Sequence, residues 1–209
     1  MEVFRITEVI RLPRERYKDY PLIFEYENEE HYAVRATETP EGFAFQLVRE
    51  KLPGPMRKRF VEHLFQHYLA DPEANGIEED GKLAAIIETD REFWNNRMKI
   101  TDLVVLPEYR RRGYGRLLVE KAKELAKKEG FRALFLDTHS CNTPAIDFYL
   151  ALGFRFTGLD TTYYSNTDIA RKEVMLQMVY VFTDSASMGW HYETHFVSRH
   201  SRNGEGTVE

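Results

Sequence analysis

The chain has 209 residues, enough for one sizeable domain or for a domain with a small appendage. Hydrophobic residues make up 43% and aromatic residues 13%, which suits a globular core, and a net charge of −5 does not favour nucleic acid as the main partner. The single cysteine, Cys141, excludes a disulfide within the chain. With no signal-peptide pattern and no membrane-length apolar run, we expect a cytoplasmic protein with no membrane partner.

Charge is uneven along the chain. Residues 108–132 carry nine basic and four acidic side chains, whereas residues 71–92 carry eight acidic and two basic ones. One face is therefore expected to take an anion and another a cation, with ordinary solvated surface as the alternative.

The first half of the chain contains several short strand patterns. The sequence predicts strands over 3–11, 31–37 and 43–50, with Thr39 to Gly42 as the turn between the last two. Residues 13–30 are polar and are interpreted as a turn or short helix. Pro53, Gly54 and Pro55 are predicted to break the chain.

Residues 56–70 have apolar side chains at helical spacing, which predicts a helix. His63 and His67 lie four residues apart, which is also a metal-ligand spacing. No third ligand is near them, so no metal site is expected. The acidic segment from Asp71 to Asp80 is interpreted as a loop, and 81–88 as a turn into a strand.

The most informative stretch runs from Lys99 to Gly130. It contains a buried strand, Ile100 to Leu106, then a turn with arginines and glycines, and then an amphipathic helix that Gly130 can cap. Helix N-termini carry unpaired N–H groups and partial positive charge, and glycine permits a close backbone approach. The turn therefore predicts an anion site suited to a pyrophosphate.

After this helix, the chain predicts a short strand over Ala133 to Asp137. A short helix follows, with Thr143 as its N-cap and Pro144 at its first position, and it ends at Gly153. Two more strands are expected, one beginning with 154–157 and one over 173–182. Residues 183–209 are expected to form a partly ordered tail.

Two motifs in this region identify a resemblance. Arg110, Gly113 and Gly115 fit the turn [Q/R]-x-x-G-x-[G/A]. A second pattern, N-x-x-A-x-x-[FL]-Y-x-x-x-G-F, is satisfied by Asn142, Ala145, Phe148, Tyr149, Gly153 and Phe154. In this order, the motifs resemble the GNAT superfamily of acetyl-CoA-dependent N-acetyltransferases. Within it, the similarity is greatest to streptothricin acetyltransferase-like members, which usually have Glu at the position of Asp137.

The resemblance implies an α/β fold whose mixed, mostly antiparallel central sheet is splayed between two parallel strands and flanked by helices. It implies one N-acetyltransferase domain over 1–182, with its core at 81–182, and acetyl-CoA as co-substrate without a metal. The residues that would bind acetyl-CoA are Leu103, Val104 and Val105 on the strand, Arg110, Arg111, Arg112, Gly113, Tyr114, Gly115 and Arg116 at the turn, and Asn142 and Tyr149 beyond it.

The resemblance also implies direct attack of a neutral amine on the thioester. Tyr149 stands where the superfamily carries the proton donor for the leaving thiolate, with a core packing residue as the alternative. Asp137 stands where related enzymes carry a carboxylate that can serve as the base, and Glu88 and Asp102 are its rivals. Cys141 with His139 could suggest an acyl-enzyme, but an inert thiol near the cofactor is the favoured interpretation.

The function expected from this resemblance is acetyl transfer to the primary amine of a small cationic molecule, such as a streptothricin, an aminoglycoside or a polyamine. The first alternative is a protein lysine or N-terminal acetyltransferase. The second is a non-catalytic acyl-CoA-binding module. A monomer or a homodimer is expected in either case.

Overall fold

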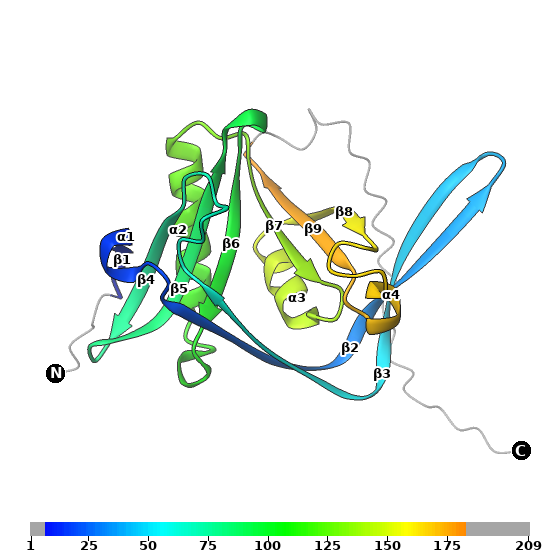
Figure 1. The fold of residues 1–209 in the computed structure, drawn as a ribbon, viewed down its shortest axis with the longest axis horizontal. Helices are drawn as coiled ribbons and strands as arrows, with labels where there is room; N and C mark the ends of the chain where they lie inside the picture. The colour runs from blue at the N-terminus through cyan, green and yellow to red at the C-terminus, as the bar shows by residue number, and fades with distance from the viewer. Residues whose placement is uncertain (1–6, 183–209) are drawn as a thin grey trace, which may run out of the picture.

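The structure is a computed structural model and describes residues 7–182 (Figure 1). Within these residues, seven strands form the central sheet in the order β1-β4-β5-β6-β7-β9-β8, and two long strands, β2 and β3, form a separate hairpin. The strands are β1 (Val9–Leu12), β2 (Pro21–Thr39), β3 (Gly42–His63), β4 (Glu73–Glu79), β5 (Lys82–Glu92), β6 (Arg97–Val105), β7 (Ala133–His139), β8 (Arg155–Asp160) and β9 (Met175–Val181). The helices are α1 (Arg14–Tyr17), α2 (Tyr114–Lys128), α3 (Thr143–Ala151) and α4 (Asp168–Arg171), with short 3-10 turns η1 (Phe93–Asn95) and η2 (Pro107–Tyr109).

The sheet is antiparallel except at its centre. Strands β6 and β7 run parallel and pair from Arg97 with Ala133 to Ile100 with Leu136, where the pairing ends. Both strands continue beyond that point, so they separate into a splay. This confirms the fold class expected from the sequence, an α/β fold with a mixed, mostly antiparallel sheet opened between two parallel strands.

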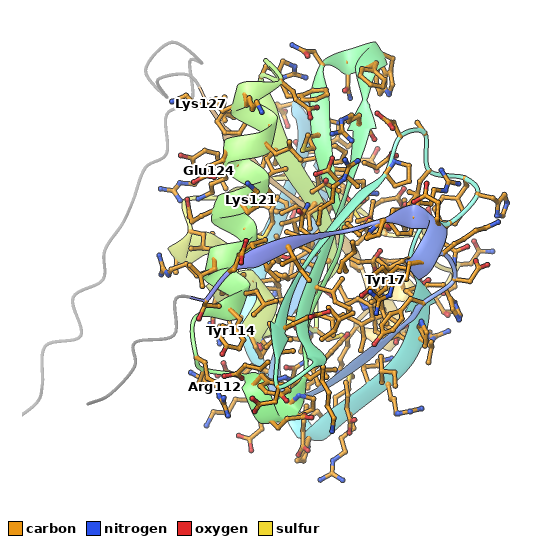
Figure 2. All side chains as sticks on the ribbon, turned by 90° about the vertical axis from the view of Figure 1, so that its left-hand side faces the viewer. Tyr17, Arg112, Tyr114, Lys121, Glu124 and Lys127 are labelled. Carbon is orange, nitrogen blue, oxygen red and sulfur yellow. The ribbon has the colours of Figure 1, made fainter. Side chains whose placement is uncertain are left out.

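The two faces of the sheet have different covers. Helices α2 and α3 share a core cluster that includes Leu118, Leu136 and Tyr149. On the other face, Leu22 and Leu64 from the hairpin pack with Tyr17 of α1. Figure 2 shows α2 along one face and Tyr17 on the opposite side of the sheet. We call this opposite side the hairpin-side face.

A β-bulge in β6 changes which side chains reach that face. Glu88 of β5 pairs with Asp102, but the next pair is Thr89 with Ile100, so Thr101 is the extra residue. Before the bulge, Ile100 packs with the α2 cluster, whereas after it Val104 packs with the hairpin-side cluster. The bulge therefore places Asp102, two residues before Val104, on the hairpin-side face.

The largest difference from the sequence-based prediction is the hairpin. Residues 56–70 are not a helix, since β3 extends to His63, and β2 already begins at Pro21, inside the segment interpreted as a turn or short helix. Pro53 to Pro55 do not end the strand; they belong to a bulge, because Asn28 pairs with Met56 and Glu30 with Lys51. His63 and His67 consequently do not lie on one helix face.

The misleading feature was a helical spacing that coincides with strict alternation. From Met56 to Glu62, even-numbered residues are half-buried and odd-numbered ones exposed, which is the pattern of a strand with one solvated face. The pairing of both strands over almost their whole length then outweighs the helix propensity of the segment.

Smaller corrections concern the edges of the sheet. The described part of the first strand begins at Val9, and the acidic segment at 71–80 is not a loop but contains β4. Strand β4 needs glycine at residue 76, where a Cβ would lie 3.0 Å from Leu83 and 3.2 Å from the Ala85 carbonyl oxygen. Helix α3 is capped by Asn142 and not by Thr143, because the Asn142 side chain accepts from the Ala145 amide.

Other predictions hold. Gly130 has φ 79°, and the amide of Phe131 donates to the Ala126 carbonyl, which is the Schellman end expected for α2. The strand predicted after 81 is β5, and the last two strands are β8 and β9. The tail predicted over 183–209 lies outside the described residues. Among the described helices, none is both long and apolar enough to cross a membrane.

Candidate active site

The splay between β6 and β7 leaves backbone N–H and C=O groups at the centre of the sheet without a strand partner among the described residues. Leu103, Val104 and Val105 pair with β5 on one side, but on the other side their strand has moved away from β7. Strand edges of this kind can hold an extended ligand as an added strand. The three residues expected to line the pantetheine arm therefore lie on the opened edge.

The glycine turn follows directly from this edge. After η2, Arg111 has φ 65° and Gly113 has φ 87°, and α2 then begins at Tyr114. Gly115 packs close to the second motif and to the opened strand edge. A Cβ there would be 3.3 Å from the Phe148 ring and 3.6 Å from Val105. The first amides of α2 face outward from this compact turn, as an anion site requires.

The arginines of the turn have different roles. Arg110 donates to the carbonyl oxygens of Val105 and Glu25, at 3.1 and 2.8 Å, and so ties the turn to the hairpin. Arg112 contacts a Glu79 carboxylate oxygen at 2.9 Å and donates to the Glu108 carbonyl. Arg111 and Arg116 are exposed, whereas the Tyr114 ring is buried in the core.

Two carboxylates lie side by side on the hairpin-side face. Glu88 is fully buried and accepts from the Phe65 amide at 2.7 Å and the Thr101 hydroxyl at 3.0 Å. Asp102 is its cross-strand partner. Burial, together with the negative charges of Glu88 and Glu62, raises the pKa of Asp102 to about 7. Burial also raises the pKa of Glu88.

Asp137 lies across the splay from these two. It is the first residue of β7 after its pairing with β6 ends, and it alternates with the core residue Leu136. Its Oδ2 is 2.6 Å from Lys99 Nζ. Burial opposes the charge on Lys99, but the attraction of Asp137 outweighs it and raises the pKa of the ammonium. Asp137 is therefore held by a full positive charge.

Tyr149 and Asn142 both belong to α3. The Tyr149 ring is buried and packs edge-on against Phe148 and Phe154, with ring centroids 5.1 and 5.3 Å away. Burial and the charge of Asp102 raise the pKa of its phenol, so the phenol lies within electrostatic range of Asp102. Asn142 uses its side-chain oxygen to cap α3, at 3.4 Å from the Ala145 amide.

An aromatic wall completes the site, and sequence reasoning did not find it. Tyr26 hydroxyl lies 3.1 Å from His139 Nδ1, and the His139 ring lies 6.1 Å from Phe60 and 4.5 Å from Tyr164. These rings come from the hairpin, from β7 and from the loop before α4. The available signal in the sequence was the two-residue spacing of Phe24 and Tyr26, and of Phe60 and Glu62, which places each pair on one face of a strand.

Cys141 adjoins this wall, since its Sγ lies 4.0 Å from the Tyr26 hydroxyl. It is fully buried, and burial raises the pKa of its thiol. The ring nitrogen of His139 that has a partner faces Tyr26, so His139 is not arranged to activate the thiol. Asn28 of β2 donates to the Cys141 carbonyl and the Tyr32 amide donates to the Ser140 carbonyl, which fixes the hairpin across the end of β7.

A splayed sheet with a glycine turn at one end and carboxylates at its centre defines an acetyltransferase fold. Residues 41–154 match the family model described as "Acetyltransferase (GNAT) family", and the chain belongs to that family. The resemblance inferred from the two motifs is thereby confirmed.

Among characterised proteins, the chain is 39% identical to streptothricin acetyltransferase from Streptomyces lavendulae over 88 residues, which is 42% of this chain and 47% of that protein. It is 33% identical to streptothricin acetyltransferase A from Bacillus subtilis (strain 168), over 60% of this chain and 78% of the relative. It is also 32% identical to the [ribosomal protein bS18]-alanine N-acetyltransferase of Escherichia coli (strain K12), over 65% of this chain and 87% of the relative.

Solved structures agree on the fold. A crystal structure of nourseothricin acetyltransferase superposes with a TM-score of 0.66 at 27% identity and covers 83% of this chain and 97% of its own. A Bacillus anthracis str. Ames protein, solved in complex with acetyl coenzyme A, has a TM-score of 0.65 at 19% identity and covers 85% of this chain and 98% of its own.

Proposed function

We propose that this protein is an N-acetyltransferase that transfers the acetyl group of acetyl-CoA directly to a primary amine of a small cationic molecule of the streptothricin type. The observation that carries the proposal is the splay between β6 and β7, where an opened strand edge leads to the glycine turn and Asp102 lies beside Glu88. Asp102 has a pKa of about 7, and the buried phenol of Tyr149 lies near enough to feel its charge.

Acetyl-CoA fits the chemistry of the cleft. Leu103 to Val105 offer an opened strand edge for an extended amide-bearing arm, and the turn at Gly113 offers outward amides for a pyrophosphate. Arg111 and Arg116 add positive charge there, while Arg110 and Arg112 hold the turn to the hairpin and to β4. The B. anthracis protein of the same fold binds acetyl coenzyme A in its crystal structure, which supports this assignment.

We assign the base to Asp102, with Glu88 as the neighbour that tunes it. The acceptor must lose a proton before or during attack on the thioester carbonyl, and a base with a pKa near the working pH serves best. Asp102 meets this condition because it is partly buried beside Glu88, whose own oxygens are already engaged by Phe65 and Thr101. The pairing with Lys99 disfavours Asp137 as the base, since Oδ2 is already engaged by the ammonium group at 2.6 Å.

We assign the acid to Tyr149. When the amine nitrogen bonds to the carbonyl carbon, the carbon–sulfur bond breaks and the sulfur leaves with the electron pair. The Tyr149 O–H can supply a proton to that sulfur, while Asp102, directly or through water, takes the proton that the amine gives up. Burial raises the pKa of the phenol, so it is protonated at the pH where Asp102 is ionised. Both groups are then in the required states together.

The position of the hairpin favours a small acceptor over a protein chain. Tyr26, Asn28 and Tyr32 of β2 contact the end of β7 and the loop after it, so the hairpin crosses the face on which Asp102 lies. Asp102 and Glu62, whose negative charge raises the pKa of Asp102, make this side of the sheet acidic, which suits a cationic amine. The similarity to an alanine N-acetyltransferase of E. coli keeps a protein N-terminus as the second candidate acceptor.

Release of CoA from acetyl-CoA tests the proposal. The purified chain would be assayed with streptothricin, aminoglycosides, polyamines and peptides that begin with alanine. We expect turnover with one or more of the small cationic amines and little with the peptides. A preference for the peptides would favour the second candidate, and the absence of turnover with every acceptor would favour a non-catalytic acyl-CoA-binding module.

A further inference from the structure

One buried side-chain oxygen, Oδ1 of Asp137, lacks within the described part of the chain the hydrogen-bond donor that a buried oxygen normally has. Lys99 holds Oδ2 of Asp137, but Oδ1 is buried and has no hydrogen-bond donor among residues 7–182. The Asp137 side chain is only 13% exposed. Buried carboxylate oxygens are normally paired, because an unpaired one loses its hydration without compensation. The orphaned oxygen therefore points to a donor that comes from outside the chain.

The surroundings of Asp137 fit a cationic donor. The loop between β8 and α4 carries Tyr163 and Tyr164, whose side chains are 52% and 45% exposed. The Tyr164 ring lies 4.5 Å from the ring of His139, two residues after Asp137 on β7, and 4.9 Å from the Tyr163 ring, so both phenols lie near the ion pair. Burial and the charge of Asp137 also raise the pKa of Tyr164. Exposed rings beside a carboxylate offer π faces to an ammonium group and can shift to admit it.

Oδ1 of Asp137 and the proposed base Asp102 lie on different strands of the sheet. Asp102 lies on β6 after the bulge and Asp137 on β7 after the last pair, so the two carboxylates stand on opposite sides of the splay. An acceptor whose reacting amine lies at Asp102 can extend across the splay toward Asp137. The positive charge of Lys99 is already matched by Oδ2, and Asp102, Glu62 and Glu88 keep the surroundings negative.

We propose that Asp137 is a specificity residue whose free oxygen Oδ1 accepts from a second, distal ammonium group of the acceptor. The preferred substrates are then diamines and longer polyamines, or molecules that carry such a chain, and a monoamine is a poor substitute. This inference rests on the proposed function and adds a second contact point to it. It gives Asp137 a binding role and leaves proton removal to Asp102.

Matched acceptors test the inference without any variant. Wild-type kcat/KM would be measured for putrescine and cadaverine, for butylamine and pentylamine as matched monoamines, and for the amino alcohols of the same lengths. We expect at least one diamine to exceed its monoamine and its amino alcohol by about tenfold, the size of one charge-assisted contact. Equal values for diamine and monoamine, or for diamine and amino alcohol, would overturn the inference.

The variant Asp137→Asn locates the effect. It should raise KM for the preferred diamine about tenfold, change its kcat by less than about threefold, and so remove most of the preference for the diamine over the monoamine. Asp19→Asn is the matched control, because it removes the same charge at an exposed residue with φ 63°, a conformation that asparagine tolerates. The control should leave the diamine preference intact, and thermal unfolding would verify that both variants fold.

The result that opposes the inference is distinct. If Asp137→Asn lowers kcat equally for all acceptors and removes the acid limb of the pH profile, Asp137 is the base and not a binding residue. If the wild-type protein acetylates no amine in this set or in the wider panel, the proposed function itself is wrong, and the inference fails with it.

Discussion

The side chain that most directly tests the chemistry is Tyr149. Its ring is packed between Phe148 and Phe154, so Tyr149→Phe keeps the packing and removes only the proton. We expect turnover to fall about ten- to a thousandfold, the range typical of a lost general acid, because the thiolate would then leave without a proton donor. Steady-state CoA release measures this loss. Acetyl-CoA affinity and the unfolding temperature serve as controls and should stay near those of the wild type.

A different outcome for this variant would be equally clear. If turnover in Tyr149→Phe is nearly unchanged, Tyr149 is a packing residue, and the leaving sulfur takes its proton from solvent or from another group. The ring would then serve only to pack the core cluster that α2 and α3 share.

The pair formed by Asp102 and Glu88 predicts a pH effect. Asp102 is active only when ionised, so kcat/KM should rise with pH through about 7, the pKa of this carboxyl. Glu88→Gln removes the neighbouring negative charge, which lowers the cost of ionising Asp102. The acid limb should therefore move to lower pH by about one unit.

The comparison of two proteins with one acceptor isolates this shift, since the titration of the amine itself is the same in both. Glu78→Gln is a suitable control: it removes the same charge at an exposed residue of β4 and leaves both carboxylates in place. An acid limb that does not move in Glu88→Gln would show that Glu88 does not tune the base, and an unchanged limb in Asp102→Asn would exclude Asp102.

At the scale of elements, the glycine turn carries the cofactor prediction. Gly113 has φ 87°, and a Cβ placed there would meet no atom within 4 Å, so the space beside it is open toward solvent and ligand. Gly113→Asp would strain the backbone and bring a negative side chain to the expected pyrophosphate. We expect acetyl-CoA binding to be lost in calorimetry.

Gly113→Asn separates charge from strain. Asparagine tolerates the left-handed conformation better than other residues and carries no charge, so it should weaken binding much less than aspartate does. Wild-type affinity in Gly113→Asp would contradict the assignment of the turn to the cofactor.

The elements also show how far the sequence could lead. The strand, turn and helix from Ile100 to Gly130 could be predicted because glycine, proline and helical periodicity act locally there. The hairpin could not, because residues 56–70 satisfy a helical spacing, and the alternating burial of residues 56–62 follows from the pairing of β2 with β3. Likewise, nothing local in Thr101 indicates the bulge that places Asp102 beside Glu88.

The candidate site follows the same division. The two motifs predicted the residues of the turn and Tyr149, and the structure places them around the splay. The aromatic wall joins His139 to Tyr26 and Phe60, which are both more than seventy positions away from it, and only the folded chain brings them together. The pairing of Asp137 with Lys99 is another long-range contact that changes which carboxylate is suited to be the base.

At the scale of the whole molecule, the uneven charge has partly internal uses. Within the acidic segment at 71–92, Glu73 contacts Arg91 and Glu79 contacts Arg112, so these two carboxylates balance basic groups of the protein itself. The negative charge available to an acceptor is instead that of Asp102 and of Glu62, whose charge raises the pKa of Asp102. Any electrostatic attraction of the acceptor should therefore arise from Asp102 and Glu62, and not from the acidic segment at 71–92 that the sequence suggested.

This placement predicts how salt affects the reaction. Raising ionic strength from about 0.05 to 0.5 M shortens the screening length from roughly 14 to 4 Å, so KM for a polycationic acceptor should rise severalfold. Glu62→Gln should reduce this salt dependence, whereas Glu78→Gln, on the acidic segment, should not, although both remove one negative charge. Initial rates at fixed acetyl-CoA measure both effects. If Glu78→Gln changes the salt dependence and Glu62→Gln does not, the acidic segment attracts the acceptor after all. The residues around Asp102 would then select the acceptor by shape alone.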